Sequence, residues 1–286
     1  MTAPLVTVVI PVLNRDRQIG PAIESVVRQT FGDWKLIVVD DHSRDETPAV
    51  VAQWSARDPR ISLLRHETTR GAQAARNTGI RAADSEWIAF LDSDDVYYPN
   101  SLADRLDCAR ACGCVVVHSA GHIWEKGAAA PVFVDLPPVT GRCYRDLLSR
   151  LGPMFQSLLV KRAALQEIGL LDETIISNQE WDTGIRLARR FRFAYVPAPT
   201  YLYNRRRTDG FFDNWARYAA GYEQIVRKHR WAMLLHGGFP MLARHYRKLM
   251  DLYYHADMET EAHRCARRAD LLSPLQAIRR RRSSGP

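Results

Sequence analysis

The chain has 286 residues, of which 46% are hydrophobic, and a formal net charge of +8. This composition supplies a buried core and excludes a disordered chain, and the length fits one large domain with an appendage or two modest domains. No apolar run approaches the ~18 residues that a membrane-spanning helix needs, and the first residues lack the pattern of a signal peptide, so we expect a cytoplasmic protein.

Strands and helices are expected to alternate along the first 120 residues. A β-branched run at residues 5–12, an amphipathic helix at 19–29 and a second apolar run at 35–39 form a strand–helix–strand unit. The alternation continues, with helices expected at 47–56 and 72–82 and strands at 61–64, 87–91 and 114–118. Apolar strands joined by helices are typical of a parallel sheet covered on both faces, so we expect an α/β fold with a mostly parallel sheet flanked by helices.

The later part of the chain changes in character. Residues 121–140 are rich in Gly, Ala and Pro, which favours loops or an edge hairpin, and aromatic, basic helices are expected at 211–229, 241–255 and 259–272. We expect these helices to bury an ordinary core of Trp215, Tyr218, Tyr222, Trp231, Tyr246, Leu249 and Tyr253. The five cysteines match neither a zinc nor a redox spacing, so we expect reduced, mostly buried thiols.

The positive charge is confined to the C-terminal third. Residues 201–286 contain 17 Lys and Arg against 8 Asp and Glu, a net charge of +9, whereas the first 200 residues contain 23 against 24. Such a basic region suits a nucleic acid, an anionic membrane surface or a solvated end. No nucleic-acid recognition module is recognisable, so we expect no nucleic-acid partner.

Polar residues follow three of the expected strands. Asn14 follows the first, Asp40 and Asp41 end the second, and the run Asp92-Ser93-Asp94-Asp95 follows the strand at 87–91. Ligands of open α/β sheets bind beyond the carboxyl ends of the strands, so these residues should share one crevice. Carboxylates suit Mg²⁺ or Mn²⁺, although Asp94 or Asp95 could instead cap a helix at 99–111.

The order and spacing of several short motifs resemble one protein family over about residues 5–205. The motifs are Val8-Val9-Ile10-Pro11-Val12-Leu13-Asn14, Gln29-Thr30-Phe31, Val38-Val39-Asp40-Asp41-His42-Ser43, Gly71-Ala72-Gln73-Ala74-Ala75-Arg76-Asn77-Thr78-Gly79, Leu91-Asp92-Ser93-Asp94-Asp95, Gly169-Leu170-Leu171-Asp172-Glu173 and Gln179-Glu180-Trp181-Asp182. Each motif is weak alone, but together they resemble the inverting glycosyltransferases of family 2, which have the GT-A fold. The resemblance implies a nucleotide-diphospho-sugar donor, with a UDP-sugar favoured, and a divalent metal ion, Mn²⁺ or Mg²⁺.

The resemblance also implies roles for individual residues. Asp41 would accept a hydrogen bond from the nucleobase, and Arg76 would contact the nucleotide. Asp94 would be the direct metal ligand, and Asp92 would reach the ribose or a metal-bound water. The expected nucleotide-binding set is Pro11, Leu13, Asn14, Asp41, Arg76, Asp92 and Ser93. Asp95 would cap the following helix and support the metal site. The alternatives are a turn or helix-capping role for Asp41 ahead of the helix at 47–56 and a surface charge at Arg76.

The catalytic base is expected at a helix start. The family carries an acidic pair before an aromatic residue there, and this chain has Gln179-Glu180-Trp181, so the resemblance places the base at Glu180. Gln179 removes a neighbouring carboxylate that would raise the pKa of the base. Asp182 is the competing base, or alternatively a helix cap.

Two further positions depart from the family pattern. Leu13 stands where many members carry a Tyr that stacks on the nucleobase, so uracil is favoured but not secured. Many members also carry a His near the position where this chain has three arginines in a row; of these, Arg205 or Arg206 could clamp the diphosphate.

The sequence therefore predicts a catalytic domain at 1–205 and a basic helical region at 206–286 that ends in a disordered Arg-rich tail. The expected activity is inverting, metal-dependent transfer of a sugar, favoured as a hexose from UDP, to a glycan or lipid-linked acceptor in cell-surface polysaccharide synthesis. The alternatives are a catalytically weak nucleotide-sugar-binding or scaffold protein and, less favoured, a nucleic-acid-binding protein. The basic helices could hold the protein at the inner face of the cell membrane, against anionic lipid, or form a homodimer interface.

Overall fold

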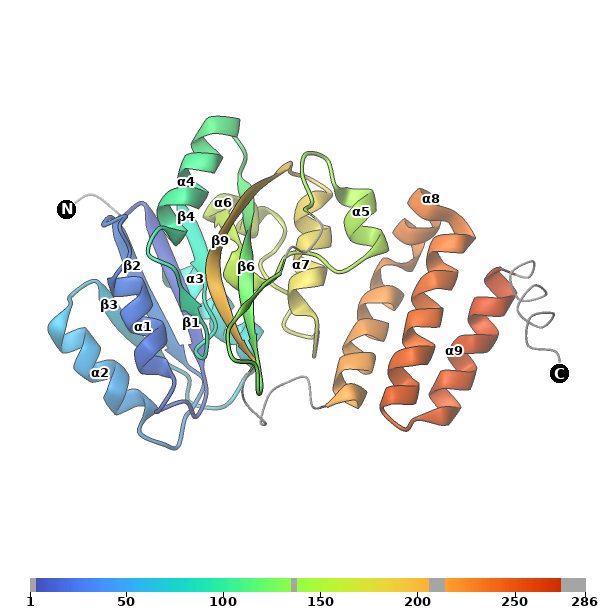
Figure 1. Cartoon of the computed structure of the whole chain (residues 1–286), viewed down its shortest axis with the longest axis horizontal. Helices are drawn as coiled ribbons and strands as arrows, with labels where there is room; N and C mark the ends of the chain where they lie inside the picture. Colours follow the sequence, from blue (N-terminus) through green and yellow to red (C-terminus); the bar gives the residue numbers. More distant parts are fainter. Residues whose placement is uncertain (1–3, 135–137, 206–213, 274–286) are drawn as a thin grey trace. The chain divides into compact units, whose positions relative to one another are not determined.

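The computed structural model describes residues 4–134, 138–205 and 214–273 (Figure 1). The chain forms two compact units: a sheet unit made of Met1–Cys143, Gly152–Glu173 and Arg186–Arg207, and a helical unit made of Tyr144–Leu151, Thr174–Ile185 and Thr208–Pro286. The predicted Arg206 clamp and the Arg-rich tail lie outside the described residues. The predicted boundary at residue 205 stays a prediction.

The sheet unit is built on a mixed sheet with the strand order β3-β2-β1-β4-β8-β6-β9-β5, to which β7 adds by pairing with β6. The strands are β1 (Val6–Val12), β2 (Trp34–Asp40), β3 (Ile61–Arg65), β4 (Trp87–Phe90), β5 (Val96–Tyr97), β6 (Val116–Glu125), β7 (Val132–Val134), β8 (Leu159–Lys161) and β9 (Phe193–Arg205). Strands β1 to β4 are mutually parallel, as predicted, whereas β8 is antiparallel to both β4 and β6. The α/β fold class is confirmed, and the β6–β7 pairing forms the predicted edge hairpin.

The register of the first strands determines where the site lies. Val12 on β1 pairs with Asp40 on β2, and Val9 on β1 pairs with Phe90 on β4. Every residue of β1 is buried, because parallel strands in the middle of such a sheet are covered on both faces. The loops that leave β1, β2 and β4 therefore start at the same edge of the sheet, as the sequence predicted.

Helices cover this sheet and are close to the expected ones. In the sheet unit they are α1 (Ile19–Val27), α2 (Thr47–Arg57), α3 (Ala72–Ala82), α4 (Ser101–Cys112), α6 (Arg162–Glu167) and the short 3-10 helix η1 (Phe155–Ser157). Helix α3 packs closely on β1, because a Cβ added to Gly79 would lie 2.5 Å from Cγ1 of Val9. Glycine at this position therefore permits the close approach of helix and strand.

The helical unit contains α5 (Tyr144–Ser149), α8 (Trp215–His255) and α9 (Glu259–Leu272), together with the first turns of α7 (Gln179–Ala188). Helix α8 bends sharply at Gly238, whose φ of 65° lies in the left-handed region, and Pro240 follows (Figure 1). The two arms of α8 are joined by a hydrogen bond of 2.8 Å between Tyr222 Oη and His245 Nδ1. No described helix is both long and apolar enough to cross a membrane.

The expected core of the helical unit is only partly confirmed. Tyr222, Leu249 and Tyr253 are buried, as predicted. Trp215 and Trp231 were also expected in the core, and this expectation is wrong, because their exposed fractions are 40% and 70%. The sharp bend at Gly238 ends the first arm of α8 soon after Trp231, and the structure leaves this indole outside the core. Among the cysteines, Cys143 and Cys265 are buried and all five are free thiols.

Candidate active site

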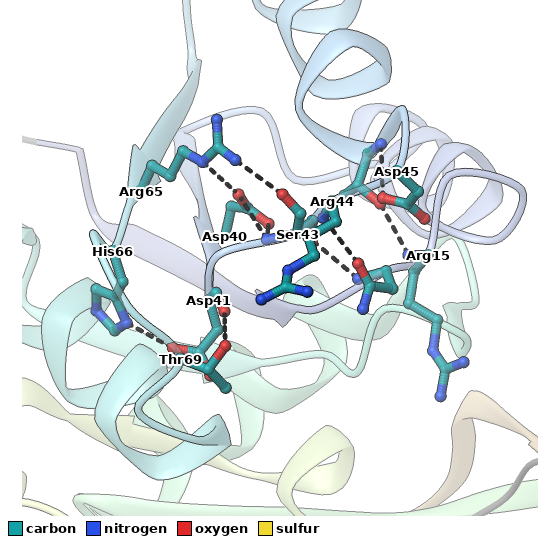
Figure 2. A network of polar contacts seen from close by, with 11 residues as sticks. Arg15, Asp40, Asp41, Ser43, Arg44, Asp45, Arg65, His66 and Thr69 are labelled. Atoms are coloured by element: carbon teal, nitrogen blue, oxygen red, sulfur yellow. Dashed lines mark hydrogen bonds and ion pairs between the residues drawn. The ribbon is translucent and has the colours of Figure 1, made fainter.

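The loops that follow β1 and β2 at the carboxyl edge of the sheet are hydrogen-bonded to each other (Figure 2). Asn14 has a left-handed backbone, its N–H donates to Ser43 Oγ at 2.8 Å, and its Oδ1 accepts from the Arg44 N–H at 2.9 Å. Asp40 is fully buried; its carboxylate accepts from the Ser43 N–H at 3.1 Å and pairs with Arg65 Nε at 3.1 Å. These contacts indicate that Asp40 and Asn14 stabilise the conformation of the loops after β1 and β2.

Asp41 holds a third loop at the same edge. Its buried carboxylate accepts from His66 Nδ1 at 2.7 Å, from the Arg70 N–H at 2.9 Å and from the Gly71 N–H at 2.7 Å. The other ring nitrogen of His66 lies 2.9 Å from Thr78 Oγ1. The orientation of the Asp41 carboxylate is therefore set by His66, directly after β3, and by backbone N–H groups of the loop that leads into α3.

The capping alternative for Asp41 is wrong. The residue before α2 is Glu46, and the N–H of Thr47 is accepted by Asp45 Oδ1 at 3.0 Å. Burial alone would raise the pKa of Asp45, but its hydrogen bonds from Thr47 and from the Asp16 N–H together outweigh this effect and lower the pKa. The carboxylate of Asp41 is directed instead toward the β3–α3 loop.

His66 was missed by the sequence reasoning. It lies directly after β3 and is buried, and it connects Asp41 with α3 through Thr78. The available signal was the same one that identified Asp41: a polar side chain immediately after a strand of the parallel set.

The aliphatic side chain of Leu13 lies beside this network. Leu13 follows β1 and is 38% exposed, whereas Pro11 within β1 is buried. An exposed Leu at the edge that carries Asp41 can contact the face of a planar ring, although without aromatic stacking. Its role toward a nucleobase stays a prediction.

Arg76 is buried beside Asp92, which belongs with Asp94 and Asp95 to the three acids after β4 that we call the acid cluster. It is not a surface charge, so that alternative is wrong. Its side chain is buried, its Nη2 donates to Asp92 Oδ1 at 2.5 Å, and its Nη1 donates to Gln73 Oε1 at 3.0 Å. The guanidinium carbon lies 4.3 Å from the centroid of the Phe155 ring, a cation–π contact. Arg76 therefore holds the carboxylate of Asp92 in one position.

The acids that follow β4 differ in their surroundings. Asp92 and Asp94 are half-buried, whereas Ser93 and Asp95 are buried. Asp95 accepts from the Asn204 N–H at 2.9 Å, which ties the acid cluster to β9. The helix-cap prediction for Asp95 is wrong, since α4 begins only at Ser101 and no side chain caps it. Burial, together with the charges of Asp92 and Asp94, raises the pKa of Asp95 well above its usual range.

The acid cluster suits a divalent cation whose remaining coordination positions are filled by a bound phosphorylated ligand. No three His, Cys, Asp or Glu side chains of the described residues converge on one metal position. However, Mg²⁺ and Mn²⁺ are commonly held by one or two carboxylates together with substrate phosphates. Asp92 and Asp94 offer such carboxylates, and Asp95 follows them with its Oδ2 buried and without a hydrogen-bond partner among the described residues. The donor set therefore suits a cation that arrives with a phosphorylated ligand.

The segment before α7 is anchored to α3. Asn77 Nδ2 donates to Leu171 O at 2.9 Å and to Glu173 Oε1 at 2.8 Å, and its Oδ1 accepts from the Leu171 N–H at 3.0 Å. Arg70 and Arg81 also pair with Glu173, at 3.4 and 3.7 Å. Two of the short motifs quoted from the sequence thus contact each other directly.

The two candidate bases lie in the first turn of α7, within the helical unit. Glu180 is half-buried. The burial of Tyr218, together with the nearby negative charge of Glu180, raises the pKa of Tyr218 to about 12. Asp182 is 1% exposed and pairs with Lys228 Nζ at 2.7 Å and His229 Nε2 at 2.8 Å. Asp182 therefore forms ion pairs with two residues of α8, which neither the base nor the helix-cap prediction for Asp182 anticipated.

Arg205, the described member of the predicted clamp, lies at the end of β9. Its Nη1 is 2.8 Å from Glu125 Oε1 on β6, so the clamp function would require exchanging this ion pair for a diphosphate. Nearby Tyr203 has a raised pKa, because its side chain is buried and the carboxylates of Asp95 and Asp92 disfavour a phenolate. The clamp stays a prediction.

Comparisons with known proteins agree with this geometry. The model of the family Glycosyl transferase family 2 matches residues 7–149. The Escherichia coli UDP-Glc:alpha-D-GlcNAc-diphosphoundecaprenol beta-1,3-glucosyltransferase WfgD is 44% identical over 161 residues, which cover 56% of this chain and 62% of that protein. The match thus spans less than two thirds of the length of this relative.

Two solved structures share the fold at low identity. S. aureus TarS 1–349 in complex with UDP-GlcNAc has a TM-score of 0.64 and 16% identity over 92% of this chain and 90% of TarS. The Pyrobaculum calidifontis mannosyltransferase PcManGT in complex with GDP-Man and Mn²⁺ has a TM-score of 0.60 and 18% identity over 100% of this chain and 77% of that one. The GT-A fold predicted from the motifs is confirmed. With the family model covering half of its residues and the strand-end motifs in place, the chain belongs to glycosyl transferase family 2.

Proposed function

We propose that this chain is an inverting glycosyltransferase that moves a sugar from a UDP-sugar to a hydroxyl group of a glycan or lipid-linked acceptor in cell-surface polysaccharide synthesis. The carrying observation is that the loops after β1, β2 and β4 leave one sheet edge and bear Leu13, Asp41 and Asp92 there. WfgD, by its name, takes a UDP-sugar and a diphosphoundecaprenol-linked sugar, and TarS binds UDP-GlcNAc. Both support this donor class.

In the proposed complex, Asp41 accepts the N3–H of uracil. Three donors hold its carboxylate in one orientation: Oδ1 accepts from His66 and Arg70, whereas Oδ2 accepts from Gly71 and retains a lone pair for a further donor. Leu13 contacts the face of the base. A preorganised acceptor of this kind discriminates against bases that lack a matching N–H, because the remaining lone pair of Oδ2 would then be covered without a donor.

The leaving diphosphate needs positive charge. Asp94 and Asp92 would hold a Mg²⁺ or Mn²⁺ ion there, which when bound stabilises the negative charge of the departing diphosphate. The hydrogen bond from Arg76 holds Asp92 in place, and Arg205 at the end of β9 could bind the diphosphate. PcManGT, bound to GDP-Man and Mn²⁺, supports this choice of metal.

Glu180 is the proposed general base. It takes the proton of the acceptor hydroxyl while that oxygen attacks the anomeric carbon, and the bond from this carbon to the diphosphate oxygen breaks on the opposite side, which inverts the configuration. Asp182 is less suited to this work, because it is buried and already neutralised by Lys228 and His229.

Two pairs of variants test these roles. We expect Asp94→Ala to weaken metal-dependent binding of a UDP-sugar about tenfold or more, and Glu180→Gln to keep donor binding but to lower turnover by roughly 10²- to 10⁴-fold. The matched controls are Asp107→Ala on the exposed side of α4 and Glu259→Gln in the first turn of α9, and both should behave as wild type. Measurements are calorimetric binding of UDP with Mn²⁺ and the rate of transfer to a lipid-linked acceptor.

The results also separate the proposal from a binding-only protein. Wild-type donor binding without multiple turnovers on any glycan or lipid-linked acceptor would favour a nucleotide-sugar-binding scaffold. Unchanged transfer by both Asp94→Ala and Glu180→Gln would refute the assigned roles.

A further inference from the structure

The bend of α8 presents large apolar side chains to solvent. Trp231, Leu235 and Phe239 are 70%, 81% and 61% exposed. Trp231 and Leu235 are four residues apart on the first arm and share one face of the helix, and Phe239 follows directly in the turn made by Gly238 and Pro240. Exposed apolar residues that gather at one place mark an interaction surface, whereas scattered ones do not.

The same stretch of chain carries only positive charge. Between Glu223 and Asp251 the sequence contains six Lys and Arg residues and no acid. They are Arg227, Lys228, Arg230, Arg244, Arg247 and Lys248. Lys228 is used by Asp182, whereas Arg227, Arg230 and Arg244 are exposed, and the Arg230 guanidinium lies 5.3 Å from the Trp231 ring centroid.

A hollow lies beside the bend. Its volume is about 420 Å³, and its walls include Arg145 on α5, Arg244 on the second arm of α8, and Pro240 in the turn. Asp146 is the acid among its lining residues, so the two arginines leave a net positive charge. The two guanidinium groups of the hollow are suited to bind the phosphate of a phospholipid, and the apolar side chains beside the hollow can contact the acyl chains of the same lipid.

We propose that this surface, which we call the α8 tip and define by Trp231, Leu235, Phe239, Arg230 and Arg244, docks on an anionic lipid bilayer. Apolar side chains that include Trp, flanked by Arg and Lys, are the composition of segments that lie in the membrane interface. The tip inserts its apolar residues at the headgroup level, and its arginines contact lipid phosphates. This inference rests on the helical unit alone and does not depend on the proposed transfer reaction.

Charge argues against a second copy of the chain as the occupant. A twofold contact through the α8 tip would bring two surfaces of net positive charge together, and like charges across an interface oppose association. An anionic bilayer instead offers complementary charge and an apolar layer at the same surface.

The test uses the full chain and vesicles of phosphatidylcholine with or without phosphatidylglycerol. We expect wild type to co-sediment with the anionic vesicles, and the double variant W231Q/L235Q to lose at least tenfold in partition coefficient, because each apolar side chain contributes roughly tenfold on burial. Glutamine keeps the helix propensity, and both positions are exposed, so the fold should remain. The matched control is Leu271→Gln, an 82% exposed leucine on α9 that should bind as wild type.

A second pair of variants tests the charge. R230Q/R244Q should lose the preference for anionic vesicles, whereas R57Q/K126Q, two exposed cations of the sheet unit, should keep it. Added salt should weaken wild-type binding. The proposal is overturned if wild type ignores anionic vesicles, if W231Q/L235Q binds as wild type, or if Leu271→Gln is equally impaired. It is also overturned if sedimentation shows a dimer that W231Q/L235Q converts to a monomer.

Discussion

The pairing of Arg76 with Asp92 makes a quantitative prediction. A double-mutant cycle with Arg76→Met and Asp92→Ala isolates the energy of this pair. Arg76→Met also loses the contact with Phe155 and the bond to Gln73, but these losses occur in both backgrounds and cancel in the cycle.

The expected coupling energy follows from burial. A hydrogen bond between charged groups contributes about 1.5–3 kcal/mol when shielded from water, whereas an exposed ion pair contributes about 0–1 kcal/mol. The side chain of Arg76 is 6% exposed and that of Asp92 is 32% exposed, so solvent screens the pair only on the carboxylate side. We therefore expect a coupling of about 1.5 kcal/mol. Arg76→Met alone should cost more, about 2–4 kcal/mol, because it leaves Asp92 without its cation beside Asp94 and Asp95.

Urea unfolding followed by tryptophan fluorescence measures this coupling for the four proteins of the cycle. A coupling below about 0.5 kcal/mol would refute the reasoning, since a pair of this geometry and burial would then contribute no more than an exposed one. Calorimetric titration of the same four proteins with UDP separates two roles of Arg76. If Arg76 contacts the nucleotide itself, Arg76→Met weakens UDP binding even in the Asp92→Ala background.

Three further predictions concern stability. Asn77→Ala should cost about 2–4 kcal/mol in urea unfolding, because it leaves a buried backbone N–H and C=O of the neighbouring segment unpaired. Gly221→Ala should destabilise the helical unit by several kcal/mol in thermal melts, since the new Cβ would lie 2.8 Å from backbone atoms of Ser177, whereas Gly20→Ala in α1 meets no atom within 4 Å and should stabilise by about 0.5–1 kcal/mol. Burial lowers the pKa of His245 from 6.5 to about 4, so between these values His245 is protonated in the unfolded chain but neutral in the folded chain. The free energy of unfolding should therefore fall by roughly 3 kcal/mol between pH 7 and pH 4, which a lower urea midpoint would show.

Regular elements with strong periodicity were predictable from the sequence. The expected helices at 72–82 and 259–272 have the same bounds in the structure. The strands expected at 5–12 and 87–91 differ by one residue at one end, and that at 35–39 is one residue longer at each end. The meeting of their polar ends was also predictable, because the carboxyl ends of parallel strands lie at one edge. These features depend on local pattern and on a general rule of sheet topology.

Contacts between distant segments were not predictable. Asp95 is 109 residues from Asn204, whose N–H it binds, and Asp182 pairs with cations 46 and 47 residues further along the chain. No local spacing indicates such partners, so a helix cap was the natural interpretation of each acid. The exposure of Trp231 was missed for a related reason: periodicity shows that a helix has an apolar face, but not what covers that face.

The acid cluster illustrates how neighbours divide roles among identical side chains. Asp92 is held by a buried guanidinium, which keeps one oxygen in place and still leaves the carboxylate half-exposed. Asp95 is fully buried and bonded to the backbone of β9, so it supports the strand that carries Arg205 and cannot reach a ligand directly. Asp94 is half-exposed, unlike Asp95, and we propose it as the member of the cluster that meets a cation delivered with the diphosphate.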